Sequence, residues 1–306
     1  MQFIKQNINF DFIGKARLAG ILSVVLILIS AVSMIVKGGP KYGIDFAGGT
    51  LIQVQFTEQI DVAKIRDIIS QIDLSGSSVQ PFGEKAENEY LISINKTTED
   101  LKGFSGKIKE IFDESFGAET FEIRRVEMVG PKVGADLRQK GFLAVICSLL
   151  GMLSYIWWRF EFKFGVGAIL ALTHDVIITL GALSLANKAI DLPIIAAILT
   201  VVGYSVNDTI IVSDRIRENR RRMGREKLDK VINISINQTL SRTIITSLTT
   251  LLVVLALFFF GGGVIHDFAF TLIVGVFVGT YSSIFIASPL LILWEKLLTD
   301  SKSQRK

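Results

Sequence analysis

An ionisable side chain, Asp208, lies inside a stretch that otherwise has the composition of a membrane-spanning helix, residues 194–213. Placing a charged side chain at that depth costs at least about 2.5 kcal/mol on insertion scales, and such residues commonly mark ion or proton pathways. Arg242 opens the next apolar stretch and is the expected counter-charge. This pair predicts a carboxyl that loads and releases a proton within the membrane.

Asp208 belongs to a run of small and polar residues at 203–209, Gly-Tyr-Ser-Val-Asn-Asp-Thr. Asn207 is adjacent to the carboxyl, and Asp214 lies at the expected membrane boundary, so both are included in the predicted proton pathway. The alternative is a face of close helix packing around a satisfied carboxylate, with Arg242 as an interfacial cation that extends to the lipid headgroups.

A second intramembrane pair, His174 and Asp175, lies near the middle of the apolar stretch 164–185. Histidine titrates near neutral pH, so this pair is a secondary candidate for the pathway. One histidine beside one carboxylate is too small a set for zinc, which needs three or four ligands. The alternative for this pair is a polar contact between helices.

Small residues predict where neighbouring helices approach closely. Gly203 and Ser205 are expected to do this beside Asp208. Gly275 and Gly279 are spaced four apart in the last apolar stretch and are expected to form a second packing face.

The elements that must position these residues are six apolar stretches in a chain of 306 residues with a mean hydropathy of +0.48. Each stretch approaches or exceeds the roughly 20 residues that cross the hydrocarbon core as a helix. The first has a basic start, but its apolar core is longer than the roughly 7–15 residues of a signal peptide, so we expect an uncleaved helix. The six expected spans are residues 18–36, 141–158, 164–185, 194–213, 244–260 and 268–294.

The distribution of Lys and Arg predicts the orientation of the spans. Basic residues gather in the N-terminal arm, in the links at 159–163 and 214–230, and in the C-terminal tail, whereas the short links on the other side carry one, Lys188. Both termini are therefore expected in the cytoplasm. Because topology accounts for the basic clusters and the net charge of +4, no nucleic-acid partner is expected, and membrane lipid is the expected surface partner.

The large segment 37–140, between the first two spans, is expected to form a domain outside the cytoplasm. Alternating and helical hydrophobic patterns predict the order β-α-β-β-α-β, which is typical of a ferredoxin-like α+β fold. The expected strands are 50–56, 78–82, 90–95 and 120–129, and the expected helices are 61–72 and 98–116. The lone cysteine, Cys147, excludes an intrachain disulfide, so this domain depends on its own core.

The rest of the sequence predicts one further helix and lacks the common catalytic, nucleotide-binding and metal-binding motifs. Apolar residues on one face of the segment 226–238 predict a short amphipathic helix on the membrane surface. The sequence has no nucleophile elbow, phosphate-binding P-loop, paired-cysteine motif or HExxH motif. We therefore expect no enzymatic activity, cofactor or metal.

Five motifs, in order, resemble those of the SecD/SecF family of protein-export proteins, and the matches run from about residue 10 to residue 294. Each motif alone is modest, but their order and topology together are specific. They are Gly-Ile-Asp-Phe-Ala-Gly-Gly-Thr at 43–50, Val-Gly-Pro-Lys-Val-Gly at 129–134, Val-Gly-Tyr-Ser-Val-Asn-Asp-Thr at 202–209 with Asp-Arg-Ile-Arg-Glu at 214–218, Leu-Ser-Arg-Thr at 240–243, and Gly-Thr-Tyr-Ser-Ser at 279–283.

The resemblance implies six helices that form half of a transporter of the RND type, completed by SecD. It implies that the two halves use the proton motive force to promote export of preproteins through the SecYEG channel. Asp208 and Arg242 would then be proton-pathway residues at the interface with SecD. The implied domains are 1–36 (arm and first helix), 37–140 (periplasmic domain), 141–294 (helices two to six) and 295–306 (cytoplasmic tail).

Two other functions remain open from the sequence. One is an autonomous proton-coupled efflux carrier for a small molecule, which would need to form a homodimer because such carriers usually have twelve spans. The other is a structural scaffold without transport, in which Asp208 and Arg242 would tolerate replacement by alanine.

Overall fold

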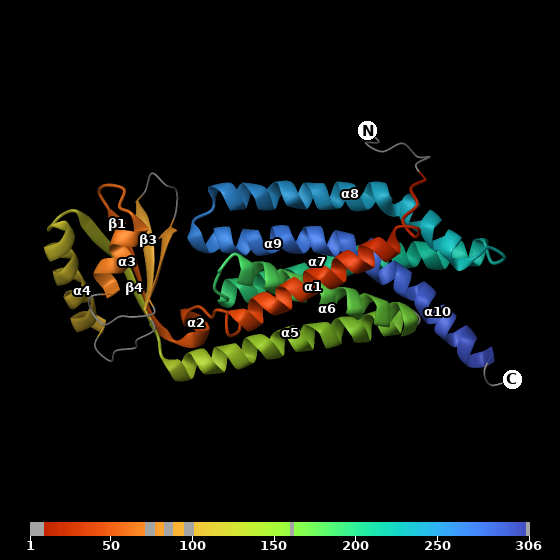
Figure 1. Cartoon of the computed structure of the whole chain (residues 1–306), viewed down its shortest axis with the longest axis horizontal. Coiled ribbons are helices and arrows are strands. Elements are labelled where there is room, and N and C mark those ends of the chain that lie inside the picture. The colour runs from red at the N-terminus through yellow and green to blue at the C-terminus, as the bar shows by residue number, and fades with distance from the viewer. Residues whose placement is uncertain (1–8, 71–76, 83–87, 95–100, 160–161, 304–306) are drawn as a thin grey trace.

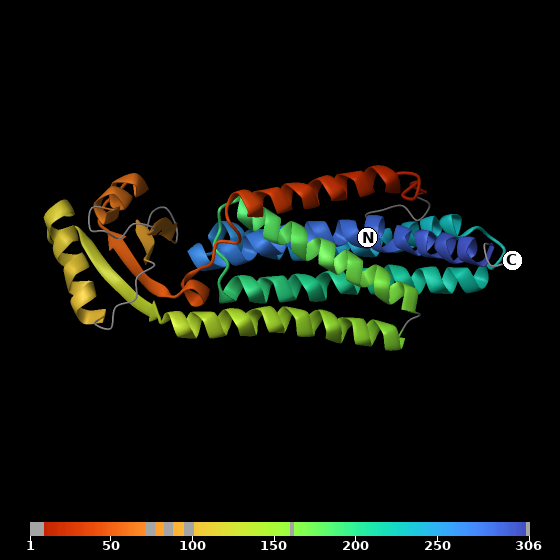
Figure 2. The ribbon, with the colours of Figure 1, turned by 60° about the horizontal axis from the view of Figure 1, so that its bottom comes forward.

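The computed structural model describes residues 9–70, 77–82, 88–94, 101–159 and 162–303, and it consists of a long helical bundle with a small α/β domain at one end (Figure 1). The beginning of α1 (Ala16–Val36) and the end of α10 (Ser288–Ser303) lie at the opposite end of the bundle from that domain. The turned view shows the same arrangement (Figure 2).

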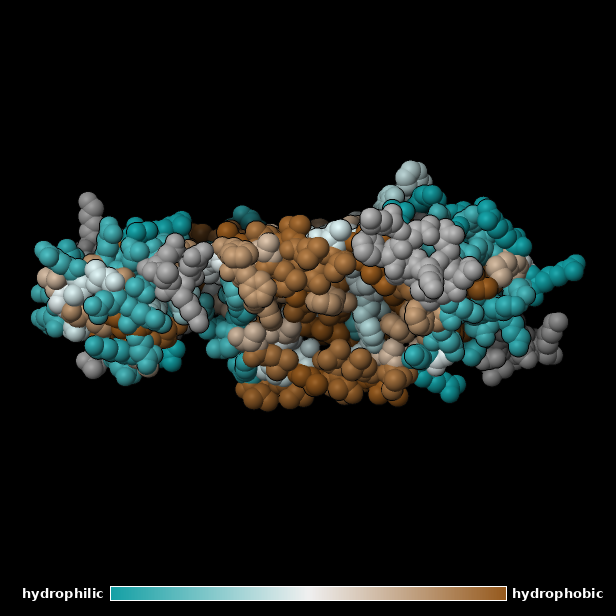
Figure 3. All heavy atoms as spheres, turned by 90° about the horizontal axis from the view of Figure 1, so that it is seen from above, coloured by the Kyte–Doolittle hydropathy of each residue, from teal (hydrophilic) through white to brown (hydrophobic). Residues whose placement is uncertain are grey.

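In the described part of the chain, six helical stretches are long and apolar enough to cross a membrane. Apolar side chains cover the middle of the bundle, with hydrophilic surfaces toward both ends (Figure 3). The stretches are α1, α5 (Pro131–Arg159), α6 (Phe162–Leu185), α7 (Leu192–Arg222), α8 (Leu228–Phe260) and the sixth, Gly263–Leu297, which comprises α9 (Gly263–Ser282), the π-helical turn η2 (Ser283–Ala287) and most of α10.

The predicted surface helix at 226–238 is wrong, because this segment is the first part of α8 and continues into the membrane-spanning part without a break. Its apolar residues Val231, Ile232 and Ile236 are buried. Ile232 and Ile236 belong to the same apolar cluster as Ile216 of α7. The two helices therefore remain packed together beyond their most apolar parts, and a short link at 223–227 joins them.

The outer domain has the predicted order of strands and helices. Strands β1 (Gly49–Phe56), β2 (Ser78–Phe82), β3 (Glu89–Ile94) and β4 (Phe121–Val129) alternate with helices α3 (Val62–Ser70) and α4 (Leu101–Phe116). The sheet order is β2-β3-β1-β4, and all three pairings are antiparallel. This is the ferredoxin-like topology expected from the sequence.

The core of this domain follows from the alternation in β1. Ile52, Val54 and Phe56 face inward and are buried, and they pack against Ile65 of α3 and Phe112 of α4. Because strand side chains alternate between the two faces, one face of the sheet is covered by the helices.

Two glycine-containing motifs far apart in the sequence meet where the domain joins the bundle. Gly48, which follows the short helix α2 (Ile44–Ala47), has φ of +75°, and a Cβ there would lie 2.9 Å from the Cα of Pro131 at the start of α5. A Cβ on Gly134 would likewise lie 2.9 Å from the backbone nitrogen of Gly48. Side chains at these positions would separate the two segments, so glycine is needed for their close approach.

The same junction is anchored to the loop between α6 and α7. The backbone nitrogen of Gly43 donates to the carbonyl of Ile190, and the nitrogen of Ile190 donates to the carbonyl of Lys41, each at 2.7 Å. Asp45 accepts a hydrogen bond from the backbone nitrogen of Leu192 at 3.0 Å. The outer domain is thus fastened to the first turn of α7, the helix that carries Asp208.

Candidate functional site

Asp208 lies in the interior of the bundle on the buried face of α7. Its exposed fraction is 2%, and the neighbouring Ser205 and Thr209 on the same face are also buried. The helical spacing of three and four residues explains why these three side chains point in one direction. The polar run at 203–209 therefore directs its carboxyl into protein, whereas Asn207 is exposed.

A threonine of the neighbouring helix contacts the carboxyl directly. The hydroxyl of Thr243, on α8, donates a hydrogen bond to Oδ1 of Asp208 at 3.2 Å. The other carboxyl oxygen, Oδ2, has no hydrogen-bond partner among the described residues. A buried carboxyl with one free oxygen is suited to accepting a proton, because protonation reduces its need for hydrogen-bond donors.

Arg242 does not form the predicted direct ion pair with Asp208. In the described part of the chain no such pair lies within 4.0 Å, and Arg242 is exposed on the surface of the bundle. The reason is helical geometry: adjacent residues on a helix differ by about 100° in direction, so Thr243 points into the bundle while Arg242 points away from it. Asp214 is also exposed, on α7. Asn207, Asp214 and Arg242 are therefore on the outside of this chain.

His174 and Asp175 lie deep in the bundle, on α6. Nδ1 of His174 and Oδ1 of Asp175 are 2.9 Å apart. The other carboxylate oxygen, Oδ2, accepts hydrogen bonds from Ser205 of α7 at 2.6 Å and from Ser282 of α9 at 2.8 Å. The carboxylate thus connects three membrane-spanning helices.

The predicted packing residues divide into two groups. A Cβ on Gly275 would lie 2.1 Å from Cγ2 of Val201, and a Cβ on Gly279 would lie 2.9 Å from the Cβ of Ser205, so these two glycines allow α9 to approach α7. Ser205 is at this contact and also donates to Asp175. A Cβ on Gly203 would meet nothing within 4 Å, so the packing role predicted for Gly203 has no counterpart within this chain.

Sequence reasoning missed a cluster of charged groups at the outer end of the bundle. Asp191 caps the N-terminus of α7 by accepting a hydrogen bond from the backbone nitrogen of Ile194 at 3.0 Å. Burial raises the pKa of Asp191 to about 6, and the charges of Asp45 and Asp267 add to this effect. The hydrogen bond from Ile194 opposes it. Lys188 forms an ion pair with Asp267 beside this group.

The signals for the missed residues were weak. In the sequence Asp191 lies three residues before the apolar stretch 194–213, outside any recognised motif, and its proximity to Asp45 and Asp267 is a tertiary feature. Thr243 and Ser282 were noticed as members of motifs, but a hydroxyl in an apolar helix does not reveal which partner it meets.

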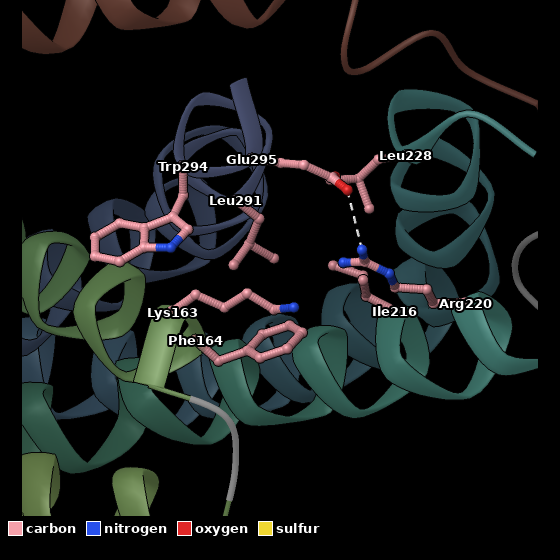
Figure 4. Close-up of a pocket in the computed structure, with 8 residues that line it drawn as sticks. All are labelled: Lys163, Phe164, Ile216, Arg220, Leu228, Leu291, Trp294 and Glu295. Carbon is pink, nitrogen blue, oxygen red and sulfur yellow. Dashed lines mark hydrogen bonds and ion pairs between the residues drawn. The ribbon is translucent and has the colours of Figure 1, made fainter. Parts of the chain in front are cut away.

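A pocket at the other end of the bundle contains none of the predicted site residues (Figure 4). Its apolar floor includes Phe164 and Leu291, and Arg220 forms an ion pair with Glu295 at 3.0 Å across it. The described residues contain no group of three or more His, Cys, Asp or Glu side chains arranged to hold a metal ion.

Comparison with known proteins identifies the family. Residues 107–297 match the family described as "Protein export membrane protein SecD/SecF, C-terminal", and residues 32–60 match the "SecD/SecF GG Motif". The second match includes the Gly48 junction.

Curated relatives match over nearly their whole length. The protein translocase subunit SecF of Magnetococcus marinus is 49% identical over 309 residues, which cover 100% of this chain and 97% of the relative. The protein of the same name from Desulfurispirillum indicum is 47% identical over 297 residues, covering 94% of this chain and 93% of the relative.

Solved structures share the fold. The crystal structure of SecDF from Thermus thermophilus, described as a translocon-associated membrane protein, is 37% identical with a TM-score of 0.84 over 96% of this chain. A SecDF structure in a "super-membrane-facing form" is 36% identical with a TM-score of 0.73 over 100% of this chain. The chain spans about two fifths of the length of these solved chains, with shares of 40% and 41%. This chain is therefore a multi-pass membrane protein that belongs to the SecD/SecF family of protein export membrane proteins.

Proposed function

We propose that the chain is an accessory subunit of protein export that works with a SecD subunit and is driven by the proton motive force. The names of its curated relatives support a role in the protein translocase. The solved SecDF chains, which are more than twice as long as the part this chain matches, support association with SecD. In this role the protein is not an enzyme. It acts at the bacterial inner membrane beside the SecYEG channel and a translocating preprotein, with its termini in the cytoplasm and its ferredoxin-like domain in the periplasm.

The proposal depends above all on the burial and the hydrogen bonding of Asp208. This carboxyl is 2% exposed, with one oxygen bound by Thr243 and the other without a partner among the described residues. Its charged and protonated forms therefore differ in the hydrogen bonds that they need. When charged, it favours a donor or a cation nearby. When protonated, it carries no net charge and releases such a partner.

Arg242 has a place in this cycle although it forms no ion pair here. Its position on α8, one residue before Thr243, means that a rotation of α8 or a movement of its long side chain would bring the guanidinium toward the carboxyl. Asn207, Asp214 and Arg242 are exposed on this chain. An exposed arginine in an apolar span is costly to leave in lipid. We therefore assign this surface to the interface with SecD.

The available energy fits a conformational step. Moving one proton across the membrane provides about 2.3 kcal/mol per 100 mV, in addition to any pH gradient. This amount biases an equilibrium between two arrangements of packed helices. Because α7 is fastened at its first turn to the outer domain through Asp45, movement of α7 is transmitted to the periplasmic side.

The proposal is tested by export of a secretory precursor in cells depleted of their own subunit and supplied with this chain. We expect the wild type to restore export that an uncoupler abolishes, and Asp208→Asn to be inserted at normal levels without restoring it. Asp136→Asn is the control, because this carboxyl is exposed on α5 and lies outside the proposed proton pathway, so its loss should have a smaller effect. Equal export by the wild type and Asp208→Asn would contradict the proposal. A stable homodimer with drug-dependent proton flux would favour an efflux carrier instead.

A further inference from the structure

The buried pair His174 and Asp175 has a geometry that the proposed role of Asp208 does not use. The two side chains are 5% and 1% exposed, in the middle of a membrane-spanning helix. Burying a carboxylate and an imidazole in such a place is costly unless their hydrogen bonds are satisfied. The contacts of each atom therefore indicate what the pair does.

Three side chains make hydrogen-bond contacts with the carboxylate of Asp175. Oδ1 faces Nδ1 of His174, and Oδ2 accepts from the hydroxyls of Ser205 and Ser282. The hydroxyl of Ser282 also lies 3.1 Å from the carbonyl of Gly279, but its contact with Asp175 is shorter. The two serine hydroxyls donate to Oδ2, and an ionised carboxylate accepts hydrogen bonds and donates none, so we take Asp175 as ionised.

The carboxylate determines the tautomer of the histidine. With Asp175 charged, Nδ1 of His174 carries the hydrogen and donates it, which leaves Nε2 as the basic nitrogen. Nε2 is buried and has no hydrogen-bond partner among the described residues. A carboxylate behind an imidazole holds the ring in position and stabilises the imidazolium that forms when the opposite nitrogen takes a proton.

We propose that His174 and Asp175 form a second intramembrane proton-binding site, separate from Asp208, in which Nε2 of His174 accepts the proton. The step forms an N–H bond at Nε2 and breaks an O–H bond of a hydronium ion, which leaves as water. Asp175 stays ionised, so the charge of the pair changes from −1 to zero. The proposal deepens the proton-driven function and rests on it for its role in export, but the binding site is testable without export.

The groups that face the pair leave it without another counter-charge in the described bundle. From α9, the ring of Tyr281 stacks on His174 with centroids 6.2 Å apart, and its hydroxyl donates to the carbonyl of Ala19 on α1. Ser23 of α1 lies 3.0 Å from the same hydroxyl. The apolar part of α1 after Arg17 carries no charged residue, and neither does α5 between Lys140 and Arg159.

Except for Asp208, the remaining charged groups on the elements packed around α6 are more distant along their helices. His266 and Asp267 are at the start of α9, about 22 Å from Ser282 at the helical rise of 1.5 Å per residue. Glu295 and Lys296 lie in the later part of α10, and η2 contains no titratable side chain. Asp208 lies about one turn along α7 from Ser205. A proton on His174 therefore removes the charge of a pair that has no cation beside it among the residues that the structure describes.

Protonation of this pair acts on the same helices as Asp208. Asp175 connects α6 to α7 through Ser205 and to α9 through Ser282, and η2 begins directly after Ser282. Single π-helical turns often occur at functional positions in helices. A change in the charge of the pair alters the strength of both serine hydrogen bonds, and hence the contact of α7 with its neighbours.

The chain offers a direct spectroscopic test because it contains two histidines. The full-length protein with His266→Gln, labelled with ¹⁵N-histidine and placed in lipid bilayers, reports His174 alone by solid-state NMR. We expect the neutral form with hydrogen on Nδ1 at pH 9, and a second N–H at Nε2 as the pH is lowered to 5. A histidine signal that stays in one protonation state over this whole range would overturn the proposal.

Two variants separate the possible origins of the signal. Asp175→Asn should abolish protonation of His174 in this range, whereas Asp208→Asn should retain it. If Asp175→Asn titrates like the parent protein, the carboxylate has no part in the site and the proposal is wrong. If Asp175→Asn does not fold, proton uptake between pH 9 and 5 by the full chain is compared with that of His174→Gln, which should take up one proton fewer. Equal uptake would also overturn the proposal.

These readouts distinguish this site from the proposed function. A failure of proton-driven export would appear as an active Asp208→Asn variant and would leave the titration of His174 unchanged. A failure of the His174 site would leave the effect of Asp208→Asn on export unchanged.

Discussion

Thr243 of α8 donates its hydroxyl hydrogen to Asp208 of α7 across 3.2 Å. The residue that the charge pattern points to, Arg242, is one position earlier and faces outward. The buried carboxyl is thus held by a neutral donor within the chain, and the cation is placed on the surface that we assign to the partner subunit. The proposed proton site is thus linked to the contact between α7 and α8 and, through Arg242, to the proposed assembly with SecD.

Removal of the Thr243 hydroxyl should impair proton-driven export. Thr243→Val keeps the side-chain shape but leaves Asp208 without its hydrogen-bond donor, and a hydrogen bond to a charged group contributes about 1.5–3 kcal/mol. We expect uncoupler-sensitive export to fall at least several-fold, measured in depleted cells at equal membrane levels of each variant. Thr243→Ser, which retains the hydroxyl, should stay close to the wild type. Equal activity of Thr243→Val and Thr243→Ser would show that this contact is not used.

Enlarging the glycines of α9 should destabilise the bundle. In Gly275→Ala the new methyl would be 2.1 Å from Val201, so backbone or side chains must shift, and overpacking of this kind typically costs about 1–3 kcal/mol. Gly279→Ala would displace Ser205 and so weaken its bond to Asp175. Thermal unfolding in detergent should show lower midpoints for both variants.

Gly203→Ala is the matched control for these substitutions, since nothing lies within 4 Å of its Cβ position. Alanine also favours helix over glycine by about 1 kcal/mol. Its midpoint should therefore be unchanged or higher. A fall in the midpoint of Gly203→Ala as large as that of Gly275→Ala would contradict the assigned contacts.

The outer end of the bundle should lose stability as the pH rises through about 6. The pKa of Asp191 is raised from 3.8 to about 6 in the folded protein, so the folded state holds this proton more tightly than the unfolded state does. The stabilisation is complete below about pH 4, is lost as the pH rises toward 6, and changes little above that. When unfolding midpoints are measured between pH 4 and 7.5, this loss of stabilisation by Asp191 should contribute a decrease between pH 4 and about 6.

The variant Asp191→Asn separates the contribution of Asp191 to the pH dependence of stability from the contributions of other carboxyls. Asparagine retains the N-cap of α7 but does not titrate. We expect the unfolding midpoint of Asp191→Asn to rise relative to that of the wild type between pH 4 and about 6.5. Above this pH the difference between the two midpoints should stay constant. A difference that is constant with pH would show that Asp191 has an ordinary pKa.

Local patterns in the sequence were sufficient for most of the fold. The alternation around Ile52 and Val54 predicted β1, and the order of apolar patterns predicted the ferredoxin-like domain. The boundary of α8 was missed because the segment 226–238 is polar on one side. Its apolar side is buried against α7, and only the tertiary contact with Ile216 shows that the helix continues.

The contacts of the site were less predictable than its residues. The apolar context of Asp208, and of His174 with Asp175, made these side chains visible without a structure. Their partners depend on how each helix is rotated about its axis, and a rotation of 100° exchanges Thr243 for Arg242. A charged residue in an apolar stretch is easy to identify in a sequence. Thr243, Ser205 and Ser282 contribute through hydroxyls, and because hydroxyl residues are common in membrane helices, the sequence does not single them out.

The most direct test of the central claim is proton flux through the assembled protein. The full chain, reconstituted with its SecD partner in vesicles that hold a pH-sensitive dye, is subjected to a pH gradient and membrane potential. The account predicts a proton flux in the wild type that Asp208→Asn reduces to the level of empty vesicles, with the exposed control Asp136→Asn retaining most of it. Flux that is the same in the wild type and Asp208→Asn would contradict the account.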